Sequence, residues 1–407
     1  MKYVIILGDG MADEPIEALG GKTPLEYAAT PAMDRLAKMS QIGMAKTIPD
    51  GMQPGSDTAN LSVMGYDPKI YYTGRSPLEA LSIGVDMEPE DIALRCNLVT
   101  LTKEEENYED RKIIDHSSGE ISTEDAAVLL EAVREALEDD IYKFYVGTSY
   151  RHLTIWKHGQ VVPLEAPHDH LGQVIGAYLP KEKVLYEMMK KSYDILANHP
   201  INIQREKEGL NPANSIWFWG AGTRPALTSF KEKTGKDGVM ISAVDLLKGI
   251  AVGASMENIQ VEGANGGLHT NYKGKALAAV KALTQDGKDF AYIHIEAPDE
   301  MGHQGSLENK IEAIESIDRY VVDTVVSGLD ASGEAYRLMI LPDHPTPLRT
   351  RTHSSEPVPF LLYDSRAPRQ EQWLYNEREA KTGGLYVAAG HTLMDMLLEN
   401  VAVNSDK

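Results

Sequence analysis

Carboxylate and imidazole side chains stand just after three short apolar segments, residues 3–7, 290–295 and 338–341. These side chains belong to Asp9, Asp299, His303, Asp343 and His344. A further histidine, His353, shortly precedes a fourth apolar segment. Deprotonated carboxylates and neutral imidazoles are ligands that divalent metal ions use in proteins. If the apolar segments are neighbouring strands of a parallel sheet, these groups meet at one edge, and we predict a metal site there.

A serine in a turn provides a second chemically active group. Ser56 follows Pro54 and Gly55, which favour a turn, and the pattern from Ala59 onward predicts a helix. Free N–H groups at a helix N-terminus attract anions, so Ser56 is a candidate nucleophile toward phosphate. The competing interpretation is that Ser56 caps the helix, because serine is a preferred N-cap residue. Capping is the better interpretation of this stretch alone, whereas the metal-ligand pattern favours the nucleophile.

The composition argues against several classes of protein. Hydrophobic residues make up 42% of the 407 residues and charged residues 25%, as in soluble globular proteins. The net charge of −21 argues against nucleic-acid binding, which needs basic surface. No apolar run approaches the roughly 18 residues of a membrane span. The single cysteine, Cys96, allows no internal disulfide. We therefore expect a cytoplasmic protein without nucleic-acid or membrane partners.

The elements that must position the candidate ligands come from both ends of the chain. The length favours two domains, and continuous apolar strands alternating with capped helices predict an α/β fold. From about residue 90 the pattern changes, and the middle of the chain contains no comparable ligand set. We predict a metal-binding core made of residues 1–90 and 265–407. Residues 91–264 should form an inserted cap of α/β or α+β character.

The combined motifs are Pro54-Gly55-Ser56-Asp57-Thr58-Ala59-Asn60, Asp299-x-x-x-His303, Asp343-His344 and Thr352-His353. Together they resemble the alkaline phosphatase superfamily. More narrowly, they resemble the archaeal-type cofactor-independent (2,3-bisphosphoglycerate-independent) phosphoglycerate mutases. Shorter stretches such as Gly8-Asp9-Gly10 and Tyr150-Arg151-His152 extend the resemblance along nearly the whole chain.

The resemblance implies an alkaline-phosphatase-like core and interconversion of 3-phosphoglycerate and 2-phosphoglycerate, a step of glycolysis and gluconeogenesis. It implies two divalent ions, manganese or magnesium and sometimes zinc, and no added 2,3-bisphosphoglycerate. One ion would take Asp299, His303 and His353, and the other would take Asp9, Ser56, Asp343 and His344. Ser56 would become phosphorylated, while the cap excludes water and holds the small phosphorylated acid. The candidate substrate-binding residues are Arg151, His152, Arg224, Lys275 and Arg75.

Two other activities are compatible with a metal-bound serine. Some relatives of the archaeal type are thought to act as homoserine kinases, and a metal-dependent phosphatase would use the same nucleophile. A kinase must also bind a nucleotide donor, and the sequence contains neither a P-loop nor another recognised nucleotide-binding motif. This absence favours the mutase. The sequence gives no indication of the oligomeric state.

Overall fold

In the computed structural model, which describes residues 1–399, the chain forms two compact units. Unit 1 consists of residues 1–72 together with the chain from Ala226 onward, and unit 2 is Thr73–Pro225. Within residues 1–399, no helix combines the length and the hydropathy that a membrane span requires.

An eight-stranded sheet forms the centre of unit 1, in the order β13-β2-β12-β11-β1-β10-β8-β9. Its strands are β1 (Lys2–Gly8), β2 (Gln41–Ala45), β8 (Gly238–Ile241), β9 (Glu257–Asn258), β10 (Phe290–Ile295), β11 (Tyr336–Leu341), β12 (Val358–Asp364) and β13 (Leu385–Val387). β8, β10, β1 and β11 are parallel neighbours, so their carboxyl ends share one edge. β12 is antiparallel to β11, and therefore begins at that same edge.

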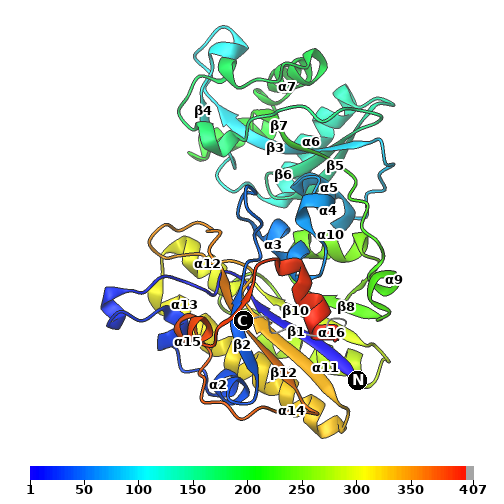
Figure 1. The fold of residues 1–407 in the computed structure, drawn as a ribbon. Helices are drawn as coiled ribbons and strands as arrows, with labels where there is room; N and C mark the ends of the chain where they lie inside the picture. The colour runs from blue at the N-terminus through cyan, green and yellow to red at the C-terminus, as the bar shows by residue number, and fades with distance from the viewer. Residues whose placement is uncertain (400–407) are drawn as a thin grey trace. The chain divides into compact units, whose positions relative to one another are not determined.

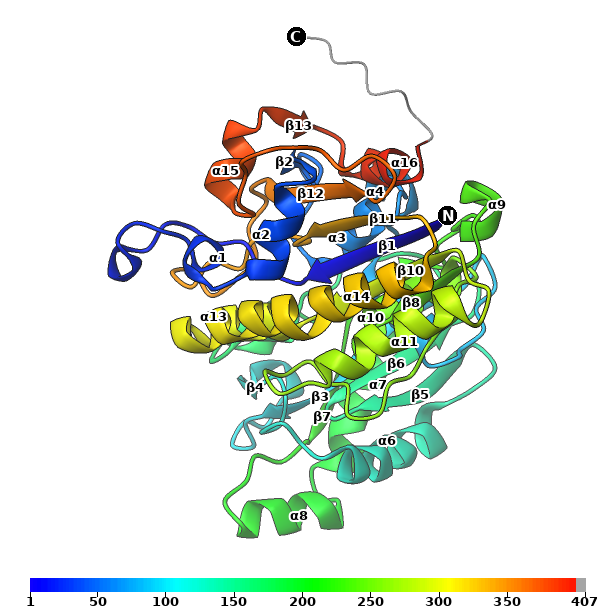
Figure 2. The same ribbon diagram turned by 90° about the horizontal axis from the view of Figure 1, so that it is seen from below.

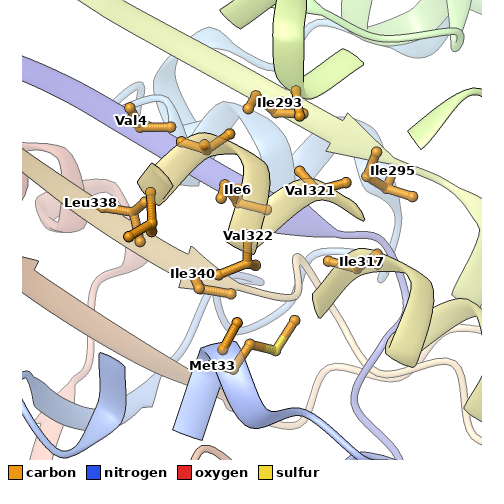
Figure 3. Close-up of a cluster of buried hydrophobic side chains, with 14 of the residues drawn as sticks. Val4, Ile6, Met33, Ile293, Ile295, Ile317, Val321, Val322, Leu338 and Ile340 are labelled. Atoms are coloured by element: carbon orange, nitrogen blue, oxygen red, sulfur yellow. The ribbon is translucent and has the colours of Figure 1, made fainter. Parts of the chain in front are cut away.

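Helices cover both faces of this sheet (Figures 1 and 2). One face carries α2 (Pro31–Ala37), α11 (Tyr272–Thr284), α13 (Leu307–Ser316), a π-helical segment (Ile317–Val322) and α14 (Asp323–Ser332). Figure 3 shows alternate strand residues such as Ile6, Ile293 and Ile340 facing this helical layer. The other face carries α3 (Ser56–Val63), α10 (Asp245–Gly253) and α16 (Leu393–Leu398). The shorter helices are α1 (Pro24–Tyr27), α4 (Pro68–Tyr71), α9 (Phe230–Thr234), α12 (Ala297–Gln304) and α15 (Glu377–Thr382).

Unit 2 is an antiparallel α+β unit. Its strands are β3 (Ile92–Leu101), β4 (Ile113–Asp115), β5 (Tyr142–Thr148), β6 (Arg151–Trp156) and β7 (Ser215–Thr223), and its helices are α5 (Arg75–Ser82), α6 (Thr123–Leu137), α7 (Lys183–Leu196) and α8 (Pro200–Lys207). β3 pairs with β4, β6 and β7, and β5 pairs with β6. Alternate residues of β3 face opposite sides, so Leu94 packs in the cluster that includes α6 and α7, whereas Ala93 packs in the one that includes α5.

The boundaries of the two units differ from the predicted domain boundaries. The prediction assigned residues 73–90 to the core and residues 226–264 to the cap, whereas these segments lie in unit 2 and unit 1, respectively. The second segment belongs to unit 1 because its strand β8 pairs with β10 in the large sheet. The first belongs to unit 2 because α5 packs on β3 and β7. The predicted α/β class is confirmed.

Candidate metal centre

The predicted ligand residues gather at the carboxyl edge of β1, β10 and β11. They are Asp9, Asp299, His303, Asp343, His344 and His353. Asp299 and His303 lie one turn apart on α12, which begins directly after β10, so both point to one side of that helix. His353 lies in the segment that leads into β12, whose antiparallel direction brings it to this edge.

Asp299, His303 and His353 form one group of this centre, with His344 within reach. The Nε2 atoms of His303 and His353 lie 3.2 and 3.3 Å from Asp299 carboxylate oxygens and 3.0 Å from each other. Asp299, His344 and His353 offer ligand atoms within 4.8 Å of one another. Burial would raise the pKa of Asp299, but hydrogen bonds with His303 and His353 hold it well below its usual value. The Asp299 carboxylate in turn raises the pKa of His303 to about 9.

Asp9, Asp343 and His294 form the other group, with ligand atoms within 4.8 Å of one another. The Nε2 atom of His344 lies 3.5 Å from Asp9 Oδ1 and 3.5 Å from Asp343 Oδ2. Burial, followed by the charges of Asp343 and Asp299, raises the pKa of Asp9 well above its usual value.

The surroundings of the Asp9 carboxylate show whether the residues fit a metal ion. Its Oδ1 atom is buried and has no hydrogen-bond partner among the described residues. An ionised carboxylate in such a place is costly unless a cation compensates it. Neighbouring carboxylates, neutral imidazoles and an orphaned oxygen form a donor set that suits a divalent cation. The residues at this edge therefore fit the metal expected from the sequence.

Ser56 is the first residue of α3 and lies beside the second group. Its Oγ atom is 3.1 Å from His344 Nε2. The N-cap is Gly55 and no side chain caps the helix, so the capping interpretation of Ser56 is wrong. The Nδ2 atom of Asn60 donates to the Ser56 carbonyl at 2.8 Å and to Asp343 Oδ2 at 2.9 Å. Asn60 thus fixes the first turn of α3 to a predicted metal ligand.

His294 is a member of the centre that the sequence analysis missed. It lies near the end of β10, is fully buried, and contacts Asp9 Oδ2 at 2.9 Å. Burial lowers its pKa to about 3. The available signal was a single histidine within the apolar run 290–295, at the same strand end as the predicted ligands. A lone histidine in an apolar strand is usually structural, and only the pairing of β10 with β1 brings it to Asp9.

Three of the predicted substrate-binding residues are arginines on unit 2. Arg75 pairs with Glu79 at 3.0 Å. Arg151 is exposed at the start of β6, with its guanidinium over the Tyr150 ring. Arg224 donates to the Met87 carbonyl at 2.7 Å and keeps 44% of its side chain exposed. Arg151 and Arg224 therefore retain surface on which an anion can be bound.

The other two predicted substrate-binding residues, His152 and Lys275, are buried. His152 points to the side of β6 opposite to Arg151, and burial lowers its pKa to about 4, so it is neutral. Lys275 lies in α11 of unit 1 with no exposed surface. Its Nζ atom donates to the His294 carbonyl at 3.1 Å. Lys275 therefore supports the backbone of β10 beside the candidate metal centre.

Comparisons with known proteins agree with the family resemblance expected from the motifs. A family profile described as 2,3-bisphosphoglycerate-independent phosphoglycerate mutase matches residues 37–202. A Geobacter sulfurreducens protein named probable 2,3-bisphosphoglycerate-independent phosphoglycerate mutase is 48% identical, over 98% of this chain and 100% of its own length. A Methanosarcina barkeri protein of the same name, without "probable", is 46% identical over the same shares.

Solved structures resemble the chain over its whole length. The PH0037 protein from Pyrococcus horikoshii has a TM-score of 0.83 and 31% identity, covering 100% of this chain and 99% of its own. A cofactor-independent phosphoglycerate mutase from Thermoplasma acidophilum has a TM-score of 0.66 and 26% identity, covering 99% of this chain and 100% of its own.

Proposed function

The chain belongs to the 2,3-bisphosphoglycerate-independent phosphoglycerate mutase family, and we propose that it interconverts 3-phosphoglycerate and 2-phosphoglycerate through a phosphoserine at Ser56. The observation that carries this proposal is the place of the Ser56 hydroxyl. It lies at the start of a helix, 3.1 Å from His344 and beside two groups of carboxylate and imidazole ligands. No added bisphosphoglycerate is needed, because the phosphoryl group is stored on the protein.

Residues of both groups would hold the metal, with Ser56 added to the second and His294 left out of it. We assign Asp299, His303 and His353 to one divalent ion, and Asp9, Ser56, Asp343 and His344 to the other. Manganese and magnesium are the expected ions. A divalent cation bound there would lower the pKa of the Ser56 hydroxyl and neutralise phosphoryl oxygens.

The side chains of the centre have separate tasks in the reaction. The Ser56 Oγ atom attacks the phosphorus of 3-phosphoglycerate, and the bond from phosphorus to the 3-oxygen of glycerate breaks. The proton lost by Ser56 ends on that 3-oxygen, which restores the 3-hydroxyl of glycerate. Asn60 fixes the positions of Ser56 and Asp343 relative to each other, because its Nδ2 atom donates hydrogen bonds to both. The Tyr292 hydroxyl in turn donates to Asn60 Oδ1 at 2.6 Å. After glycerate reorients, its 2-hydroxyl attacks the phosphoserine and regenerates Ser56. We assign the binding of the glycerate carboxylate and phosphate to Arg75, Arg151 and Arg224.

The decisive experiment incubates the purified protein and Mn²⁺ with 3-phosphoglycerate alone, and separately with ATP and L-homoserine. We expect 2-phosphoglycerate in the first reaction, without added bisphosphoglycerate. Chelation should stop the reaction, and Mn²⁺ or Mg²⁺ should restore it. Formation of O-phosphohomoserine without mutase turnover would instead identify a kinase. Release of inorganic phosphate as the sole product would identify a phosphatase.

A further inference from the structure

Both imidazole nitrogens of His294 are engaged inside unit 1. The Nε2 atom lies 2.9 Å from Asp9 Oδ2, and the Nδ1 atom lies 3.2 Å from the hydroxyl of Ser242. His294 and Asp9 are both buried, and Ser242 is 7% exposed. Such an imidazole either binds a metal ion through Nε2 or donates an Nε2 proton to Asp9. The two roles require opposite tautomers.

The contacts of Ser242 favour one of these tautomers. Its Oγ atom accepts a hydrogen bond from the Val244 N–H at 3.0 Å. The hydroxyl proton is then available for the other close partner of Oγ, which is His294 Nδ1. If Nδ1 accepts that proton, the neutral imidazole carries its own proton on Nε2 and donates it to Asp9 Oδ2.

We propose that His294 is a positioning residue, which orients the Asp9 carboxylate for the metal ion and is not itself a ligand. This inference rests on the proposed metal site. The hydrogen bond occupies Oδ2 of Asp9, so Oδ1 remains for the cation. Oδ1 is the atom without a hydrogen-bond partner among the described residues, and it lies 3.5 Å from His344 Nε2. The carboxylate therefore presents one defined oxygen to the centre.

The position of His294 is itself fixed from two neighbouring elements. Ser242 follows β8, which pairs with β10, and holds the imidazole ring. Lys275 on α11 donates to the His294 carbonyl and holds the backbone. β10 also pairs with β1, which ends immediately before Asp9. The chain Ser242–His294–Asp9 thus crosses three adjacent strand ends, as a preformed support of a metal ligand does.

Titration calorimetry with Mn²⁺ tests the proposal independently of turnover. His294→Leu removes the donor, and we expect it to weaken Mn²⁺ binding about tenfold or more, with an unchanged number of sites. His294→Gln keeps an N–H donor near the Nε2 position and should restore most of the affinity. Ser242→Ala should fall between the wild type and His294→Leu. His152→Leu, at another buried histidine, serves as the control and should leave Mn²⁺ affinity unchanged.

A measurement on the wild-type protein covers the case in which the Leu variant fails to fold. ¹⁵N NMR of histidine-labelled protein with Mg²⁺ should show His294 protonated on Nε2 and not on Nδ1, assigned by loss of the signal in His294→Gln. A proton on Nδ1, or a lost Mn²⁺ site in His294→Gln, would overturn the proposal and make His294 a ligand. Neither readout uses phosphoglycerate, so failure of the mutase assay and failure of this inference remain distinguishable.

Discussion

Two buried carboxylates of the proposed metal centre differ in how their charge is compensated. Asp299 accepts hydrogen bonds from two histidines, and these hold its pKa well below the usual value despite burial. Asp9 is buried beside Asp343 and Asp299, and its pKa is raised well above the usual value. Its closest imidazole, His294, is kept neutral by burial. A cation therefore offsets more unfavourable electrostatic energy at Asp9 than at Asp299.

The role of the Ser56 hydroxyl can be tested by a substitution that removes only its oxygen. Ser56→Ala should abolish phosphoryl transfer, because the nucleophile is lost, while the carboxylate and imidazole groups still bind Mn²⁺. Mutase assays and Mn²⁺ calorimetry measure the two effects separately. Ser62→Ala is a matched control, since Ser62 is buried on the same helix and its hydroxyl has no hydrogen-bond partner among the described residues. Near-native turnover in Ser56→Ala would remove Ser56 from the mechanism.

Buried Lys275 predicts a pH dependence of stability. Burial lowers its pKa from 10.5 to about 8, so between these values the unfolded chain binds more protons than the folded chain. The contribution of Lys275 to the free energy of unfolding is therefore constant below about pH 8. It rises between pH 8 and 10.5, by up to about 3 kcal/mol.

Urea denaturation of the wild type and of Lys275→Met, at pH values from 7 to 10.5, isolates this effect. The difference in unfolding free energy, wild type minus variant, should increase with pH across that window. Lys281→Met is the control, since Lys281 lies on the same helix with an exposed side chain. A difference that stays flat or falls with pH would show that Lys275 is not buried as a charged group.

At the scale of elements, the turn after β1 is packed against α12 and leaves no room for a side chain at Gly10. Its φ is +59°, and an added Cβ would lie 2.6 Å from Asp299 Oδ1 and 2.8 Å from the Asp299 Cα. The backbone of Asp299, a proposed metal ligand, would have to move to accept it. Gly10 also donates its N–H to Asp343 Oδ1 at 3.1 Å, so the same turn orients a second proposed ligand.

Gly10→Ala should therefore damage the metal centre, and a second glycine provides the matched control. Gly20 has a similar φ of +67°, but an added Cβ would meet no atom within 4 Å. Both substitutions incur the left-handed backbone cost of about 1 kcal/mol, whereas only Gly10→Ala should lower Mn²⁺ affinity, by roughly tenfold or more. Thermal unfolding and Mn²⁺ calorimetry of the two variants check this. Equal losses of Mn²⁺ affinity in the two variants would mean that the backbone strain alone causes the effect.

Local sequence patterns predicted the strands that lead to the proposed ligands, because those strands are continuous apolar runs. The predicted strand 290–295 coincides with β10. The start of α3 was predicted three residues late, since the first turn, Ser56-Asp57-Thr58, contains polar residues that also occur in turns. β8 was missed because its four residues are too few for a periodic pattern. Only its pairing with β10, about fifty residues away, assigns it to the large sheet.

At the scale of the whole molecule, the candidate ligands that gather at one sheet edge could be predicted, and the residues that support them could not. Ligands at strand ends have recognisable residue types, whereas the role of His294 depends on a neighbouring strand and on Ser242. Arg151 and His152 show the same limit, because adjacent strand residues face opposite sides and one sequence motif covers both. The net charge of −21 likewise does not predict these local contacts.

The division into two units leads to the last prediction, that unit 1 binds metal without unit 2. Every residue assigned to the metal, and Ser56, lies in unit 1, and unit 2 contributes no strand to its sheet among the described residues. The chain segments that leave and re-enter unit 1 run close together, since the Tyr66 hydroxyl donates to the Thr228 carbonyl at 2.8 Å. A short linker should therefore be able to replace Thr73–Pro225.

A protein in which a Gly/Ser linker replaces Thr73–Pro225 should fold, as judged by near-UV circular dichroism, and bind Mn²⁺ with affinity close to that of the full chain. It should lack mutase activity, because the proposed substrate cations Arg75, Arg151 and Arg224 are gone. As a control, Asp9→Asn in the same shortened protein should weaken Mn²⁺ binding. That loss would show that the Mn²⁺ is bound at the proposed site. A shortened protein that folds but binds no Mn²⁺ would mean that unit 2 is required to form the metal centre, because the ligands of unit 1 would then be insufficient by themselves.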